Sequence, residues 1–347
     1  MAVEAPEHRA IDAGPRFRIS RGLLTVSAAL ILLVIASAVL APTSVDHSAL
    51  LGMLPFAAVL AIVGIGQTLV VQQGGIDLSV PGAVSLAVVI TTHRPAGDDD
   101  KLLGALVFGL AVAIGFGVLN GVLVGWRRLN PIVATLGVNA LMYAAVLSIS
   151  GGSPRRTTAL LRNVAGGVTF GVPNSVYIAV VVVAIAAVVM KTTIGGRRFE
   201  AIGANPVAAA ATGLPVTWYR AGAYVWAQIL YWLAGVLLAG IIAQPTAFQG
   251  DAYLLPSIAA VVLGGTSLLG GRGFLVATAI AAVFLSQLEQ FVLALGVSFA
   301  IRTLVEAAAL TVGVALYTVD WAAVRRRLTS TPQLPLSTAS SRKGTSS

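Results

Sequence analysis

Charged and amide side chains are rare in the apolar stretches of this chain, so each one is a candidate for binding a polar solute or a proton. Asp77 follows two glycines in QQGGIDLSVPG, where it either caps the helix that comes next or lines a polar path. Glu289 lies in a polar cluster, where it is either a proton or cation relay or a residue that reaches water from the outer end of its helix. The candidate pathway residues are Gln67, Asp77, Asn139, Gln228, Gln287, Glu289 and Gln290.

The sequence lacks the patterns of an enzyme active site. It has no cysteine, its three histidines are scattered, and it holds no Ser/His/Asp arrangement, carboxylate dyad or H-E-x-x-H motif. The glycine-rich segment GGTSLLGGRG at residues 264–273 invites comparison with a P-loop, but Gly271 stands where the phosphate-binding lysine must be. We therefore predict no catalytic residue, no metal site and no cofactor in this chain, and any energy from ATP has to come from another subunit.

A short segment at residues 205–215, NPVAAAATGLP, carries helix start and stop signals but no apolar face. Asn205 can cap the first amides, Pro206 suits the first helical position, and Gly213 followed by Pro215 ends the helix. A helix of about two turns is marginal alone, because isolated helices need roughly 12 to 15 residues. The segment is either an ordinary connecting helix packed on its neighbours or a contact for a soluble partner.

The composition indicates a membrane protein. Hydrophobic residues make up 57% of the 347 residues and the mean hydropathy is +0.91, which is more apolar surface than a water-soluble domain can bury. We predict an all-α polytopic fold with about ten transmembrane helices. Windows of about 20 apolar residues place them at residues 23–41, 50–72, 80–92, 102–125, 131–150, 174–190, 220–243, 254–269, 273–295 and 301–319. The flanking segments, residues 1–22 and 321–347, are polar and predicted to be disordered cytosolic tails around a membrane domain at 23–320.

The positive charges predict the orientation rather than a nucleic-acid partner. With both termini in the cytosol, 16 of the 22 Lys and Arg residues fall on the inner side, including those of an inner loop at residues 191–219. The loop at residues 153–173 does not fit this bias, since it is external and contains Arg155, Arg156 and Arg162. A docking surface is one possible reason for those three arginines.

Two spans are too short to cross a bilayer comfortably. The third and the eighth each begin near a proline, Pro81 and Pro256, and run in opposite directions. Paired short segments of this kind indicate two inverted five-helix halves with the translocation path between them. The alternative is that both are tilted or buried helices.

The fourth span has a small residue at every fourth position, which lets another backbone approach closely. We expect its partner to be a helix of the same chain rather than a second copy. The residues are Ala105, Gly109, Ala113, Gly117, Gly121 and Gly125.

Several segments in this order resemble the ribose-type permease subunits of bacterial ABC importers, which are grouped with the branched-chain amino acid permeases. The similar phrases are GQTLVVQQGGIDLSVPGAVSLA, NPIVATLGVNALMYAAVLSISGG, TIGGRRFEAIGANPVAAAATGLPV and YLLPSIAAVVLGGTSLLGGRGFLVAT, and the resemblance as a whole covers about residues 54–320. Pro81 stands where relatives often have glycine, and Glu289 with Gln290 replaces a commonly neutral, Asn-rich pair.

The resemblance implies a bacterial inner-membrane protein that works with a second permease, two cytosolic ATPase subunits holding ATP and Mg, and an extracytoplasmic solute-binding protein. It also implies that residues 200–213 couple the chain to the ATPase. The residues implied in coupling are Glu200, Gly203, Asn205, Pro206, Ala209, Ala210 and Gly213.

The expected function is import of a monosaccharide or similar small polar solute by alternating access. Amides and hydroxyls, rather than paired charges, favour a neutral solute. Branched-chain amino acid or nucleoside import is the nearest alternative. A secondary transporter that uses Glu289 as a proton carrier is a second alternative.

Overall fold

The computed structural model describes residues 21–298, 300–301, 304, 307–308 and 311. The predicted C-terminal tail, residues 1–20 of the predicted N-terminal tail and most of the predicted tenth span lie outside the described residues, whereas Arg21 and Gly22 form the start of α1. Helices dominate, with the bounds α1 Arg21–Leu40, α2 His47–Gln72, α3 Val80–His93, α4 Leu102–Gly121, α5 Pro131–Ser150, α6 Ala159–Gly166, α7 Asn174–Thr192, α8 Ile194–Ala204, α9 Pro206–Ala211, α10 Val216–Ile241, α11 Leu254–Leu263 and α12 Leu275–Ala294. A π-helical turn at Val122–Trp126 extends α4, and 3-10 turns lie at Pro42–Ser44, Asp99–Lys101 and Gln249–Tyr253 (η4).

Seven of the described helices are long and apolar enough to cross a bilayer. Each holds 19 to 28 residues, which at 1.5 Å per residue matches a hydrocarbon core about 30 Å thick. The prediction of an all-α polytopic membrane protein is therefore confirmed. The helices α3 and α11 contain only 14 and 10 residues, so the expected shortness of the third and eighth spans is also found.

The two central helices, α2 and α10, have the same length and pack against each other. The helix that follows each short helix then packs on the opposite centre, so that α4 lies against α10 and α12 lies against α2. The short helices themselves show the same reciprocal arrangement: α3 contacts α10, and α11 contacts α2. This reciprocal packing is what two inverted halves predict.

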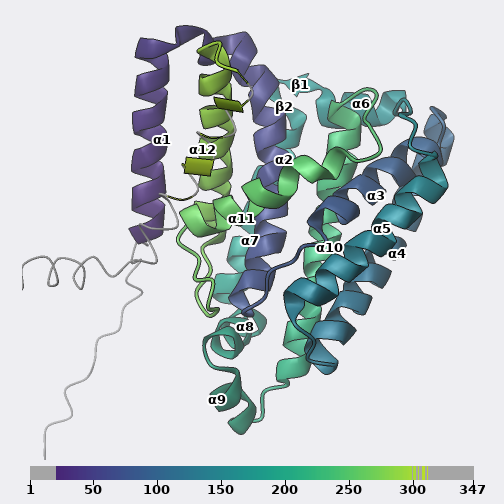
Figure 1. Cartoon of the computed structure of the whole chain (residues 1–347), viewed down its shortest axis with the longest axis vertical. Coiled ribbons are helices and arrows are strands. Elements are labelled where there is room, and N and C mark those ends of the chain that lie inside the picture. The colour runs from purple at the N-terminus through teal and green to yellow at the C-terminus, as the bar shows by residue number, and fades with distance from the viewer. Residues whose placement is uncertain (1–20, 299, 302–303, 305–306, 309–310, 312–347) are drawn as a thin grey trace, which may run out of the picture.

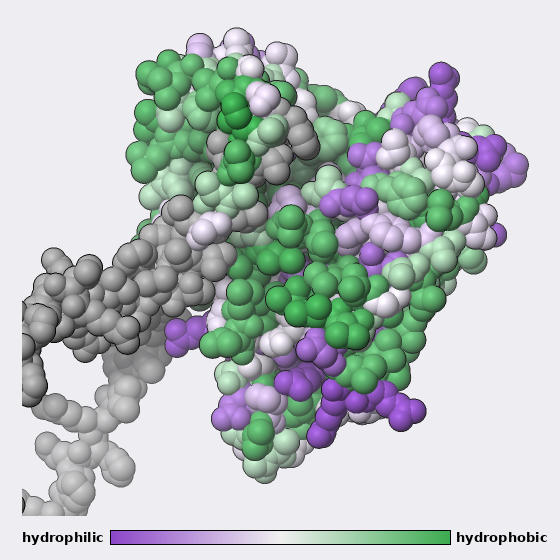
Figure 2. Space-filling view, viewed as in Figure 1, coloured by the Kyte–Doolittle hydropathy of each residue, from purple (hydrophilic) through white to green (hydrophobic). Residues whose placement is uncertain are grey.

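Figure 2 shows hydrophilic surface towards two ends of the bundle with hydrophobic surface between them, and Figure 1 shows which elements lie at each end. One end carries α8 and α9 and is called the α9 end below; the other, the α6 end, carries α6 and a two-stranded hairpin of β1 (Val168–Thr169) and β2 (Val172–Pro173). At the α9 end, the rings of Trp126 and Trp218 meet edge to face with centroids 4.8 Å apart. Tryptophans favour the membrane interface, so α9 lies beyond the apolar slab.

The small-residue face of α4 packs inside the chain, as expected. A Cβ added to Gly117 would lie 2.7 Å from the Cα atom of Val225, and one added to Gly121 would lie 2.8 Å from the backbone oxygen of Ala221. Both partners are on α10. The glycines therefore set the close approach of α4 to α10.

The loop at residues 153–173 has structure that the sequence patterns did not reveal. It contains α6, which Thr158 caps by accepting a hydrogen bond from the Leu161 amide at 3.3 Å, and the β1–β2 hairpin. Arg155, Arg156 and Arg162 are exposed on this loop. They are accessible to a partner at the α6 end.

The predicted helix at residues 205–215 is confirmed as α9. The Asn205 side-chain oxygen accepts from the amides of Val207 and Ala208 at 3.1 and 3.0 Å, and Gly213 has a φ of +81° just after the helix. A second helix, α8, precedes it and was not predicted; Thr193 caps it by accepting from the Gly196 amide at 3.0 Å. The inner loop is thus a pair of short helices.

Loss of the Asn205 cap is expected to destabilise α9 locally. Asn205→Ala removes both side-chain hydrogen bonds, which costs about 1 kcal/mol at an N-cap. In a helix of six residues this should speed amide exchange about fivefold, measured by hydrogen–deuterium exchange on a peptide covering 205–213. Asn205→Asp keeps the cap and should exchange like the parent. Equal protection in the alanine variant would show that packing, rather than the cap, holds α9.

Candidate functional site

The first turn of α3 starts inside the bundle at a buried polar network centred on Ser79. The Ser79 hydroxyl donates to Asp77 Oδ1 at 2.5 Å and accepts from the side-chain amides of Asn120 on α4 at 3.0 Å and Gln228 on α10 at 2.8 Å. All four side chains are fully buried. Ser79, and not Asp77, is the N-cap residue of α3; Asp77 instead accepts from the Ser79 amide at 2.8 Å. The capping role considered for Asp77 is therefore wrong.

The backbone around Asp77 is held by further polar side chains. In the orientation that satisfies both of its polar atoms, the Gln67 amide accepts from Asp77 N and donates to Asp77 O, both at 3.3 Å, and donates to the Tyr231 hydroxyl at 3.0 Å. On α5, Thr135 accepts from the Leu78 amide at 2.9 Å and Asn139 accepts from the Gly82 amide at 2.8 Å. Four predicted pathway residues, Gln67, Asp77, Asn139 and Gln228, thus meet at one place.

Three buried oxygen atoms of this network have no hydrogen-bond donor in the described part of the chain. They are Asp77 Oδ2, Asn120 Oδ1 and Gln228 Oε1. An unsatisfied buried polar atom costs about 1 to 3 kcal/mol, so such atoms call for an explanation. Each of these oxygens can accept a hydrogen bond from a water molecule.

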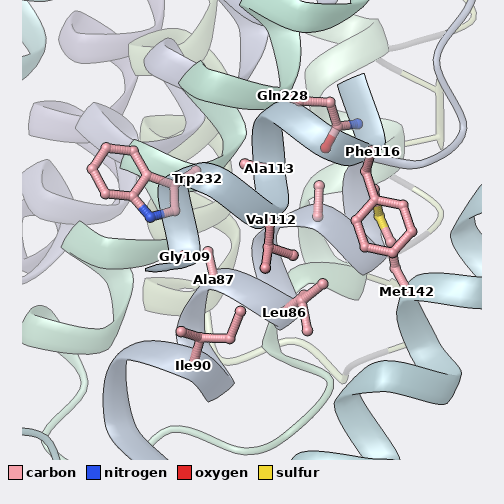
Figure 3. A pocket seen from close by; sticks show the side chains of 11 residues that line it. Leu86, Ala87, Ile90, Gly109, Val112, Ala113, Phe116, Met142, Gln228 and Trp232 are labelled. Carbon is pink, nitrogen blue, oxygen red and sulfur yellow. The ribbon is translucent and has the colours of Figure 1, made fainter. Parts of the chain in front are cut away.

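A small pocket lies beside the network, between α3, α4, α5 and α10 (Figure 3). Gln228 is the polar side chain at its edge, and Phe116, Met142 and Trp232 are among the apolar side chains that line it. The space holds no more than about one water molecule, so this pocket is too small for a sugar. A solute can pass here only if the helices move.

The Ser79 hydroxyl is expected to be a main support of the network. Ser79→Ala would leave two amide donors without their acceptor and would remove one of the two hydrogen bonds that Asp77 Oδ1 accepts, at a cost of about 2 to 4 kcal/mol. The matched control is Ser175→Ala, because the Ser175 hydroxyl is equally buried and has no hydrogen-bond partner in the described structure. Thermal unfolding in detergent should show a clear loss for Ser79→Ala only. Equal unfolding temperatures would contradict this role.

The remaining pathway candidates on α12 lie elsewhere. Gln287 is buried and donates to the Ser37 hydroxyl of α1 at 3.2 Å, so it joins α12 to α1. Glu289 is exposed on the same helix and Gln290 is half-buried. The structure does not bring these three residues to the network around Ser79.

At the α9 end, α8 packs directly against the end of α2 and against the glycine-rich segment. Gly203 is pressed so closely on Gln72, the last residue of α2, that any Cβ would collide with the Gln72 backbone oxygen. That oxygen accepts from the Gly271 amide at 2.9 Å, and Gln73 donates from its side chain to the Phe199 backbone oxygen at 2.9 Å. The backbone of the glycine-rich segment at residues 264–273, which was compared with a P-loop, therefore packs against α8.

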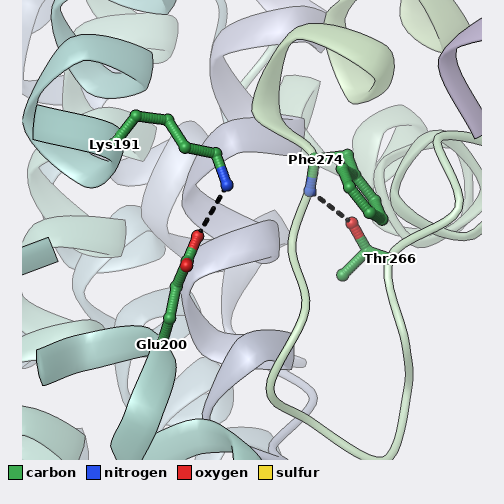
Figure 4. A network of polar contacts seen from close by, with 4 residues as sticks. All are labelled: Lys191, Glu200, Thr266 and Phe274. Atoms are coloured by element: carbon green, nitrogen blue, oxygen red, sulfur yellow. Dashed lines mark hydrogen bonds and ion pairs between the residues drawn. The ribbon is translucent and has the colours of Figure 1, made fainter. Parts of the chain in front are cut away.

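Polar contacts stabilise the region in which α8 packs against its neighbours (Figure 4). Glu200 on α8 pairs with Lys191 at the end of α7 at 2.9 Å, and the Thr266 hydroxyl accepts from the Phe274 amide at 3.2 Å across the glycine-rich segment. The Lys191–Glu200 pair is partly exposed, so it contributes little to stability, on the order of 0 to 1 kcal/mol. Its position joins α7 to α8.

Of the two alanines implied in coupling, Ala209 and Ala210, the structure exposes only Ala210. Ala209 is only 6% exposed and faces the protein, whereas Val207 is 79% exposed and Ala208 and Ala210 are exposed too. An apolar side chain as exposed as Val207, beyond the membrane slab, suits contact with another protein. The exposed surface of α9 is therefore carried by Val207, Ala208 and Ala210.

Residues that the sequence patterns did not reveal complete the network. Ser79, Asn120 and Tyr231 contact the predicted residues. Apart from the bond between Ser79 and Asp77, which are two positions apart, their contacts join residues 41 to 164 positions apart in the chain. The local motif around Asp77 was the signal that pointed to Ser79. Asn120 and Tyr231 could be identified only from the fold.

Comparison with known proteins identifies the family. Residues 49–321 match the family described as branched-chain amino acid transport system / permease component. "Ribose import permease protein RbsC" of Bacillus subtilis is 34% identical over 78% of this chain and 84% of its own length. The protein of the same name in Escherichia coli (strain K12) is 34% identical over 80% and 88%. "Probable ABC transporter permease protein y4mJ" of Sinorhizobium fredii is 31% identical over 79% and 83%.

No solved structure matches this chain. The family match covers most of the chain, and the curated relatives are similar over most of their length. The helices from α3 to α12, which include both short helices, and the segments quoted for the resemblance fall inside the matched residues, whereas α1 precedes them. The chain therefore belongs to the branched-chain amino acid transport system permease family, within its ribose-type group of sugar ABC importer permeases.

Proposed function

We propose that this chain is the permease subunit of an ABC importer that carries a monosaccharide or similar small polar solute into the cytosol by alternating access. Partner ATPase subunits, which hold the ATP and Mg, drive the cycle from the α9 end. A solute-binding protein delivers the solute to the α6 end, and a second permease, a copy or a paralogue, completes the path through the inner membrane.

The observation that carries this proposal is the contact of α8 with the end of α2 and with the glycine-rich segment that follows α11. Its residues Phe199 and Gly203 contact the end of α2, from which the chain leads through Asp77 into α3. Ala204 contacts Gly271 in the segment that follows α11. A displacement of α8 and α9 by a partner is therefore passed directly to the segments at both short helices.

The charge distribution supports a cytosolic α9 end. Arg127 and Arg128 follow α4, and Lys191, Arg197 and Arg198 accompany α7 and α8 at that end. Cytosolic loops carry an excess of Lys and Arg. In this orientation both chain termini are cytosolic, and α6 with its exposed arginines faces the solute-binding protein.

The chemistry of the network supports a neutral, hydroxyl-bearing solute. Its side chains are amides and hydroxyls, and Asp77 is the one carboxylate among its described members. Relatives at 34% identity are named for ribose import. A branched-chain amino acid or nucleoside remains the alternative solute class; an amino acid also requires partners for its ammonium and carboxylate groups.

Mild-detergent purification of the tagged chain from its native membranes tests the subunit assignment. We expect an ATPase subunit to copurify, as identified by mass spectrometry, and the eluate to hydrolyse ATP. Recovery of the chain alone, without ATPase activity, under conditions that preserve a known membrane complex of the same cells, would contradict the importer assignment and favour a secondary transporter.

A further inference from the structure

The connection between α10 and α11 enters the bundle instead of staying at its surface. Within it, the Gly250 amide donates to the Ser85 hydroxyl of α3 at 2.9 Å, and a Cβ on Gly250 would collide with the Pro81 backbone oxygen. Ser85 lies eight residues before the end of α3, which is about 12 Å below the α6 end. The connection around Gly250 is thus at membrane depth, where non-helical backbone requires protein or water around it.

An acidic side chain is exposed on this connection. Asp251, in η4, is exposed and accepts a hydrogen bond from the Tyr143 hydroxyl of α5. Tyr143 stands seven residues before the end of its helix, about 10 Å below the α6 end. In the described part of the chain no Lys or Arg pairs with Asp251. An unneutralised carboxylate at this depth is costly against lipid, so it faces an aqueous path.

Aromatic side chains flank the carboxylate. The rings of Tyr143 and Phe248 meet edge to face with centroids 5.4 Å apart and an angle of 76° between them, and Phe248 remains 39% exposed. Asn139, which holds the first turn of α3, lies four residues before Tyr143 on the same face of α5. The exposed group is therefore adjacent to the buried network around Ser79.

We propose that Tyr143, Phe248 and Asp251 form an outer solute subsite that recognises a polyhydroxyl solute before it reaches the network. The Asp251 carboxylate accepts hydrogen bonds from neighbouring hydroxyl groups, the Tyr143 hydroxyl adds a polar contact, and the exposed Phe248 ring packs against the C–H face of the solute. This inference rests on the proposed function, because it assumes that a sugar-like solute passes the chain.

The natural absence of cysteine offers a test of the aqueous path that does not require the solute to be known. In the intact complex, Asp251→Cys and Phe248→Cys should react with a charged, membrane-impermeant thiosulfonate added from the α6 side. Leu141→Cys is the matched control: Leu141 is 56% exposed, but it lies two residues from Tyr143, roughly 200° around α5. It should not react. Absence of reaction at both 251 and 248 in folded protein would overturn the subsite.

Uptake kinetics test solute recognition with D-ribose as the probe. Asp251→Asn should raise the KM at least about tenfold and Tyr143→Phe severalfold, with Vmax per complex nearly unchanged. Asp100→Asn and Tyr177→Phe are controls, since Asp100 is exposed on the turn before α4 and Tyr177 donates to the Thr169 backbone oxygen at the hairpin. A parent chain that imports no monosaccharide would contradict the proposed function. A parent that imports ribose with an unchanged KM in both variants would contradict the subsite alone.

Discussion

Aspartate at both Val207 and Ala210 is expected to abolish ATP-driven uptake while the bundle stays folded. Both side chains are on the exposed surface of α9, so the double variant places two carboxylates in the proposed ATPase contact without touching the core. Burying an unpaired charge in an interface costs several kcal/mol, and each 1.4 kcal/mol is about a tenfold loss of association. Uptake in cells and the yield of copurified ATPase should both fall at least about a hundredfold.

A neutral variant separates charge from shape at this contact. Val207→Thr keeps the size of the side chain and adds no charge, so it should retain most uptake and ATPase binding. The unfolding temperature of the purified chain should be the same for all three proteins. If the double aspartate variant binds the ATPase like the parent, α9 is not the docking element.

The second large effect is expected at the α4–α10 contact. Gly117→Leu places a branched side chain where even a Cβ atom would lie 2.7 Å from the Val225 Cα atom. The neighbour is backbone and cannot rotate away, so α4 must separate from α10. Because α10 also packs against α2 and α3, the centre of the bundle is disturbed. Overpacking usually costs about 1 to 3 kcal/mol, and a rigid backbone neighbour raises that cost. We expect little folded protein by size-exclusion chromatography in detergent.

The same substitution two residues earlier is the matched control. Gly115 lies on the exposed side of α4, and a Cβ added there meets nothing within 4 Å. Gly115→Leu should therefore be tolerated, since a leucine side chain is energetically favourable in contact with lipid and leucine has a higher helix propensity than glycine. A normal yield of folded Gly117→Leu protein would show that α4 and α10 approach each other less closely at Gly117 than in this structure.

Sequence patterns located the elements well where local chemistry determines them. The ends of α5 follow from Asn130, whose side chain accepts from the Ile132 amide at 2.9 Å, and from Gly151, which has a φ of +58°. The start and end of α9 follow in the same way from Asn205 and Gly213. Caps and apolar length are local properties, and a single sequence contains them.

Properties that depend on which side of a helix faces a neighbour were not predictable. A six-residue helix with four consecutive alanines has no apolar stripe, so nothing in the sequence placed Ala209 inward and Ala210 outward. The polar residues Gln228 and Gln287 look equivalent in sequence, yet one binds Ser79 at the network and the other binds Ser37 on α1. Their partners are 149 and 250 positions away, and only the fold brings them together.

The outer subsite was missed for a related reason. Asp251 lies between two predicted spans, residues 220–243 and 254–269, where the sequence indicates only a connecting loop. It lies at membrane depth because the Gly250 amide reaches Ser85 and no side chain at Gly250 obstructs the approach to α3. A glycine directly before an acidic residue is too common a pattern to predict such a course.

Uptake into proteoliposomes tests the central claim most directly. The purified permease–ATPase complex would be reconstituted with the solute-binding protein outside, labelled D-ribose as the probe, and ATP or a non-hydrolysable analogue inside. We predict that ribose accumulates with internal ATP and Mg, does not accumulate with the analogue, and is indifferent to a proton gradient. Accumulation that follows the proton gradient and continues without ATP hydrolysis would contradict the assignment of this chain as an ABC importer permease.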